Sequence, residues 1–71
     1  MSSSELGQAL ADIRAEREAH VTKGYDAEHD RLHGVGRLVE LAAQYAGPTF
    51  SRRELVKAAS LLVAAIEVID R

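Results

Sequence analysis

The chain has 71 residues, with nine basic and eleven acidic side chains and a formal net charge of −2, which limits it to one domain. A chain of this length buries only about 60% of the surface that its unfolded form exposes, so its own core is small. It has no cysteine, which excludes disulfides and thiol catalysis. The near-balanced charge argues against a general nucleic-acid binder, and 46% apolar residues are too many for a disordered chain.

No segment of the sequence has the character of a leader or a membrane anchor. Residues 1–5 lack the basic and apolar regions of a signal peptide. The longest unbroken apolar run, Leu61 to Ile66, has six residues, whereas a membrane-spanning helix needs about 20. We therefore expect a soluble, cytoplasmic protein.

The first helix is expected from about Ser4 to Lys23, with residues 1–5 frayed. Arg17 sits in the middle of its narrow apolar face, so we expect this helix to be mostly solvated and to dock through few contacts. The apolar residues fall near one side at 100° per residue. They are Leu6, Leu10, Ile13 and Val21.

A polar segment, residues 24–30, interrupts the helical pattern. Gly34 and Gly36 then mark the entry to a second helix, expected over about Val35 to Ala46. Gly47 followed by Pro48 ends it, since a C-terminal glycine and then proline are typical of a helix end. The apolar face of this helix is formed by Val35, Leu38, Leu41, Ala42 and Tyr45.

The third helix begins at a capping box, in which the Ser51 hydroxyl accepts from the Glu54 amide, and it continues to about Asp70. The five residues from Gly47 to Ser51 suit an antiparallel helical hairpin. The sequence therefore predicts an all-α fold in a single domain, residues 1–71. It is an antiparallel hairpin of the second and third helices plus an N-terminal helix, assembled as an oligomeric bundle.

The third helix carries more apolar surface than two short neighbours can easily cover. A polar stripe about 80° wide runs along it and leaves an apolar arc roughly twice the ~100° that packing on one neighbour requires. A central helix wrapped by the other two is one interpretation; self-association, with a dimer expected, or capture of a partner helix is the one we favour. The stripe is formed by Lys57, Ser60, Ala64, Glu67 and Arg71. The expected interface residues are Leu55, Leu61, Leu62, Ile66, Val68 and Ile69.

Two histidines have the spacing of a metal site. His29 and His33 are four residues apart, which on a helix puts both imidazoles on one face, as zinc requires. A third ligand, His20 or Glu16, is available only if the first helix folds back, so a polar segment with titratable histidines is the alternative. The same segment is a candidate binding surface, through Tyr25, Asp26, His29, Asp30 and His33.

Two other charge patterns have ordinary and functional interpretations. Glu16 and His20 are also four residues apart, which favours a charge pair over a general acid–base dyad. Arg52 and Arg53 lie on the first turn of the third helix, where cations oppose the helix dipole. They are either ordinary surface residues or contacts to an acidic partner or to the phosphates of DNA, and the net charge argues against DNA.

Three stretches together resemble a known group of proteins. They are Glu16-Arg-Glu-Ala-His20; Gly24-Tyr-Asp-Ala-Glu-His-Asp30 with His33; and Arg53-Glu-Leu-Val-Lys-Ala-Ala59 with Ile66-Glu-Val-Ile-Asp-Arg71. In order and spacing they resemble small proteins of bacteriophages and prophages, which look like shortened relatives of the all-α MazG-like nucleotide pyrophosphohydrolases. The resemblance covers about residues 14–71 and implies an all-α fold and a phage context.

MazG-like enzymes hold magnesium with Glu-Glu-x-x-Glu on one helix and Glu-x-x-Asp on the next, because clustered carboxylates suit a hard cation. This sequence offers only Glu40 on the second helix, and Lys57 stands where the aspartate after Glu54 would be. Glu67 and Asp70 have the spacing but lie at the other end of the third helix. The metal-binding carboxylate set is therefore incomplete.

These observations lead to two expected functions. The first is a non-enzymatic phage accessory protein that self-associates, needs no cofactor and binds a host protein in the host cytoplasm, affecting host growth or defence. The alternative is a MazG-like nucleotide-binding or residual pyrophosphohydrolase role with magnesium. Its carboxylates would be assembled across an oligomer interface from Glu16, Glu40, Glu54 and Glu67.

Overall fold

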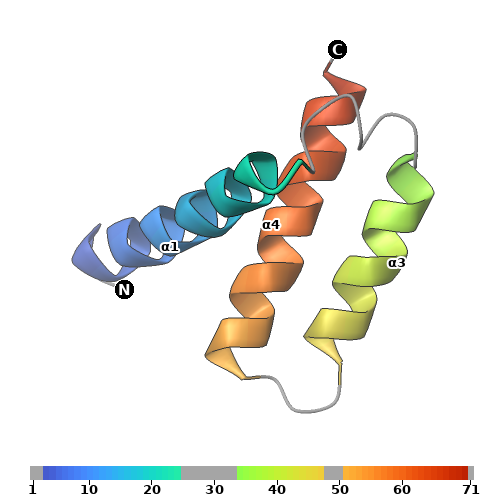
Figure 1. Cartoon of the computed structure of the whole chain (residues 1–71). Helices are drawn as coiled ribbons and strands as arrows, with labels where there is room; N and C mark the ends of the chain where they lie inside the picture. The colour runs from blue at the N-terminus through green and yellow to red at the C-terminus, as the bar shows by residue number, and fades with distance from the viewer. Residues whose placement is uncertain (1–2, 25–33, 48–50, 71) are drawn as a thin grey trace.

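The computed structural model describes residues 3–24, 34–47 and 51–70, and this part of the chain forms three α-helices and no strand. Helix α1 spans Ser3–Thr22, α3 spans Val35–Ala46 and α4 spans Arg52–Ile69. Helices α3 and α4 lie side by side and antiparallel, and α1 crosses α4 and projects away from the hairpin (Figure 1). The predicted all-α fold and its helical hairpin are confirmed.

The helix ends follow local chemistry. Ser51 caps α4, and its Oγ accepts a hydrogen bond from the Glu54 amide at 3.2 Å, as the capping box predicts. Gly34 precedes α3 with a φ of +83°, a conformation that glycine adopts without strain. Gly47 ends α3 after Ala46, as predicted, in an extended conformation with a φ of −70°. Its amide donates to the Gln44 carbonyl at 3.4 Å.

The core of the hairpin is small and rich in alanine. Leu38 of α3 packs with Ala64 and Ala65 of α4, and the half-buried side chains of Val35, Leu61 and Val68 pack against this cluster. Small side chains at the contact let the two helix backbones approach closely. The core therefore holds few large apolar side chains.

Helix α1 docks through polar contacts rather than through a leucine face. Arg17 is only 7% exposed, and its Nε donates to Glu67 Oε1 of α4 at 2.8 Å. Nearer the start of both helices, Arg52 Nη2 donates to Asp12 Oδ2 at 2.7 Å. Glu67 belongs to the polar stripe predicted on α4, so α1 packs against part of that stripe. Most side chains of α1 are exposed, as expected.

Within the described residues, no helix combines the length and the apolar character needed to cross a membrane.

Candidate functional site

An apolar stripe runs along the side of α4 that neither α1 nor α3 covers. Leu55, Leu62 and Ile69 recur every seven residues, with Ala59 and Ile66 between them. The leucines are each 45% exposed, Ile66 is 57% exposed and Ile69 is 69% exposed. Alternating steps of four and three residues are the pattern of a helix seam that packs against another helix. We call these five residues the α4 stripe.

The structure divides the six interface residues expected from the sequence into two groups. Leu61 and Val68 are half-buried against the cluster around Leu38, so they contribute to the hairpin core. The other four are exposed members of the α4 stripe. Ala59 was not among the residues expected at the interface, although its spacing from Leu55 and Leu62 places it on the same side of the helix. Pairing of this surface with another molecule stays a prediction.

Opposite charges flank the two ends of the α4 stripe. Arg52 and Asp70 are separated by five turns of about 3.6 residues, so they project from the same edge of α4 at opposite ends. Arg52 is engaged with Asp12 of α1, and the hydrogen bonds from Arg52 and then Gln8 hold the pKa of the Asp12 carboxyl below its ordinary value. Arg52 keeps further N–H donors because a guanidinium carries five.

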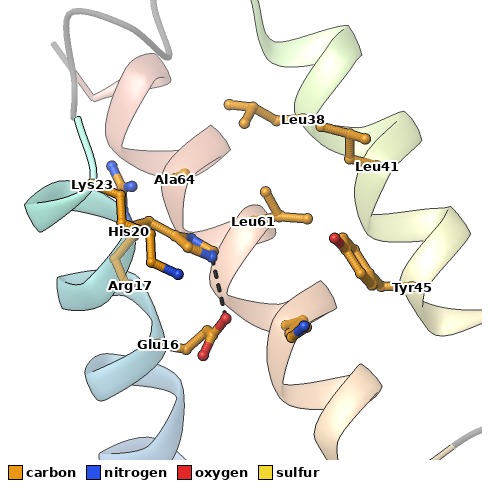
Figure 2. Close-up of a pocket in the computed structure, with 10 residues that line it drawn as sticks. Glu16, Arg17, His20, Lys23, Leu38, Leu41, Tyr45, Leu61 and Ala64 are labelled. Carbon is orange, nitrogen blue, oxygen red and sulfur yellow. Dashed lines mark ion pairs between the residues drawn. The ribbon is translucent and has the colours of Figure 1, made fainter. Parts of the chain in front are cut away.

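A cavity of about 380 Å³ lies between α1 and α3, with α4 as its floor (Figure 2). Leu61 and Ala64 of α4 lie between the residues of the other two helices in this view. Tyr45 on the α3 side is 40% exposed because its ring borders this open space rather than the core. The lining is formed by Glu16, Arg17, His20, Lys23, Leu38, Leu41, Tyr45, Lys57, Leu61 and Ala64.

The polar groups of the cavity come mainly from α1. Glu16 Oε1 lies 3.2 Å from His20 Nε2, which confirms the predicted charge pair and marks an ion pair when the imidazole is protonated (Figure 2). The Lys57 ammonium lies 5.5 Å from the centre of the Tyr45 ring, a cation–π distance. Lys23, the residue that follows α1, also lines the cavity. The shared position of Lys23 and Lys57 could not be predicted from the sequence, because no local pattern links residues so far apart in the chain.

The four carboxylates considered for nucleotide binding lie in separate surroundings. Glu16 pairs with His20, Glu67 pairs with Arg17, and Glu54 lies on the first turn of α4, where its backbone amide donates to the Ser51 cap. Glu40 lies 3.6 Å from Arg37 on the exposed side of α3. Across the described ranges, no three histidine, aspartate or glutamate side chains gather closely enough to hold a metal ion. The proposed histidine ligands and binding segment, Tyr25, Asp26, His29, Asp30 and His33, lie outside the described residues.

Comparisons with protein-family models, with curated proteins and with solved structures found no match to this chain.

Proposed function

We propose that this chain is a small, non-enzymatic interaction protein that pairs with a second copy of itself through α4. The observation that carries the proposal is the α4 stripe, whose four large side chains are 45–69% exposed. Burying a leucine or isoleucine side chain contributes about 1.5–3 kcal/mol. Burial of four such side chains from each copy would add substantially to the stability of a chain with so small a core. Assembly and folding would therefore stabilise each other.

A second copy suits this surface because three of its large side chains are evenly spaced along α4. Leu62 lies seven residues from Leu55 on one side and seven from Ile69 on the other. In an antiparallel pair centred on Leu62, Leu55 of one copy faces Ile69 of the other. The same register brings Arg52 of one copy near Asp70 of the other, because antiparallel helices pair like edges of their seams. Opposite charges there favour this register over a parallel one.

The experiment is a measurement of mass in solution, by light scattering coupled to size exclusion and by sedimentation velocity, over a range of concentrations. The wild-type chain is expected to be a dimer that dissociates on dilution. Leu62→Glu is expected to be a monomer, because it places two carboxylates at the centre of an apolar seam. The matched control is Val39→Glu on α3, whose side chain is 46% exposed but outside the stripe. A monomeric wild type, or equal effects of both variants, would contradict the proposal.

We propose further that the pair acts in the cytoplasm of a bacterial host as a phage accessory protein that binds a host protein. The support is the sequence resemblance to small phage and prophage proteins, together with the incomplete carboxylate set. Residues 25–33 supply the candidate contacts, Tyr25 and His33 among them. Purification of the tagged dimer from host lysate is expected to recover one host protein with the wild type and to lose it with Tyr25→Ala/His33→Ala. Recovery of the protein alone would count against a host partner.

The second candidate function is a MazG-like nucleotide-binding role, supported by the same resemblance. It requires carboxylates from two copies, because the described glutamates of one copy are dispersed. A nucleoside triphosphate with magnesium should then raise the melting temperature of the wild type, and Glu54→Gln or Glu40→Gln should remove the effect. No thermal shift at millimolar nucleotide and magnesium would dismiss this function.

A further inference from the structure

The cavity between α1 and α3 combines an apolar floor with a cationic border. Leu38, Leu41 and Leu61 supply apolar surface, and the Tyr45 ring supplies an aromatic wall. Its volume of about 380 Å³ falls within the roughly 300–1,000 Å³ that small-molecule sites occupy, and such sites are mostly apolar with a few polar groups. The shape and lining suit a flat apolar body stacked beside Tyr45.

The charges of the lining are unbalanced toward the positive. The chain contains only two lysines, Lys23 and Lys57, and both line this cavity. Among residues 3–24, 34–47 and 51–70, neither ammonium takes part in an ion pair. The Arg17 guanidinium is balanced by Glu67, whereas the Glu16 carboxylate contacts His20, which carries a charge only when it is protonated. Two ammonium groups that form no ion pair within the described residues, and one carboxylate, therefore border an apolar hollow in a chain whose net charge is −2.

We propose that this cavity binds a small organic monoanion with an aromatic body. The ring system packs against Tyr45 and the three leucines, and the anionic group, a carboxylate, a sulfonate or a phosphate monoester monoanion, lies between Lys23 and Lys57. A single negative charge matches the lining better than a polyphosphate does, because Glu16 also faces this space and would repel each added charge. The proposal is independent of the pairing through α4.

The cavity and the α4 stripe lie on opposite sides of α4. Lys57, Leu61 and Ala64 line the cavity, whereas Leu62 and Ile66 belong to the stripe, about half a helical turn away. A dimer formed through the stripe leaves the cavity open. Occupation of the two surfaces can therefore be measured separately.

The test uses the lysines themselves as reporters. Reductive methylation with ¹³C-formaldehyde labels Lys23, Lys57 and the N-terminal amine and preserves their charge, and Lys23→Arg and Lys57→Arg assign the signals. The probe is 8-anilinonaphthalene-1-sulfonate, an aromatic sulfonate. Its neutral counterpart, N-phenyl-1-naphthylamine, has the same rings without the anion. We expect the sulfonate to shift both lysine signals along one saturable curve and to leave the N-terminal signal unchanged.

Variants distinguish a site that recognises the anionic group from nonspecific dye binding. Lys57→Gln is expected to weaken sulfonate binding about fivefold and to leave the neutral dye unaffected. Tyr45→Ala should weaken the binding of both dyes, and Tyr45→Phe should weaken the binding of neither. Arg37→Gln, on the exposed side of α3, is the control for loss of a positive charge. ATP with magnesium should not compete. The proposal is overturned if the lysine signals do not shift, or if both dyes bind equally well and Lys57→Gln changes the affinity of neither. It is also overturned if Leu62→Glu is the only variant that abolishes dye binding, because the dye would then bind to the α4 stripe.

Discussion

The Nε atom of Arg17 donates a hydrogen bond to Glu67 Oε1 at 2.8 Å, and this pair joins the middle of α1 to the last turns of α4. The Arg17 side chain is 8% exposed and that of Glu67 is 35% exposed. A guanidinium removed from water to this extent needs a partner, because an unpaired buried charge is strongly destabilising. The pair therefore fixes where α1 lies on α4, and with it one wall of the cavity.

Glu67→Ala is expected to lower the free energy of unfolding by about 2–3 kcal/mol, because it leaves the Arg17 guanidinium buried without this carboxylate. Urea unfolding followed by far-ultraviolet circular dichroism, at one fixed protein concentration, measures the change. The control is Glu40→Ala, which removes an exposed ion pair with Arg37 and should cost at most about 0.5 kcal/mol. Equal, small losses in both variants would show that the buried pair does not hold α1.

The double variant Arg17→Met/Glu67→Leu tests the same contact from the other direction. Replacing both charges with apolar side chains of similar size removes the cost of desolvation together with the ion pair. We expect its stability to recover to within about 1 kcal/mol of the wild type. A double variant as unstable as Glu67→Ala would mean that the charges themselves stabilise the docked helix.

The sequence predicted what local chemistry controls and missed what depends on distant pairs. The capping box at Ser51 and the Gly34 entry place the ends of α4 and α3 correctly, because each acts within one turn of the chain. From the sequence, Arg17 was expected to interrupt the apolar face of the first helix, because an analysis of hydrophobic periodicity assigns charged residues to the solvent. Its partner, Glu67, lies 50 residues away, and no spacing rule joins the two. The cavity was not predicted from the sequence for the same reason.

Ser60 is completely buried, and its size limits how closely the helices pack around α4. Its Oγ donates to the Lys57 carbonyl at 2.7 Å within the same helix, so the hydroxyl does not depend on another helix. Ser60→Ala should therefore change the free energy of unfolding by less than about 1 kcal/mol. Ser60→Leu should lower it by about 1–3 kcal/mol through overpacking. Thermal unfolding of both variants measures this, and a Leu variant as stable as wild type would indicate spare room at this position.

The Asp12 carboxyl connects pH to the docking of α1. Its pKa lies below the ordinary value of 3.8, chiefly because Arg52 donates to it and secondarily because Gln8 does. A lowered folded-state pKa stabilises the fold at pH values above 3.8, and that stabilisation is lost as the pH falls through the folded pKa. In a ¹³C NMR titration, Arg52→Gln should raise the Asp12 pKa toward 3.8, and Gln8→Ala should raise it by less. An unchanged pKa in Arg52→Gln would rule out this link.

The register of the proposed dimer is testable through Asp70. In the antiparallel pair, Asp70 lies near Arg52 of the second copy, so Asp70→Arg places two cations together and should weaken the dimer about fivefold at low salt. The double exchange Arg52→Asp/Asp70→Arg restores opposite charges and should restore the affinity, although it removes the contact of Arg52 with Asp12. Sedimentation equilibrium at low and high salt measures both, and the differences should shrink at high salt because exposed charges are screened. In a parallel pair, Asp70 of one copy would lie opposite Asp70 of the other. Asp70→Arg would then replace one repulsion between like charges with another and leave the dimer dissociation constant unchanged.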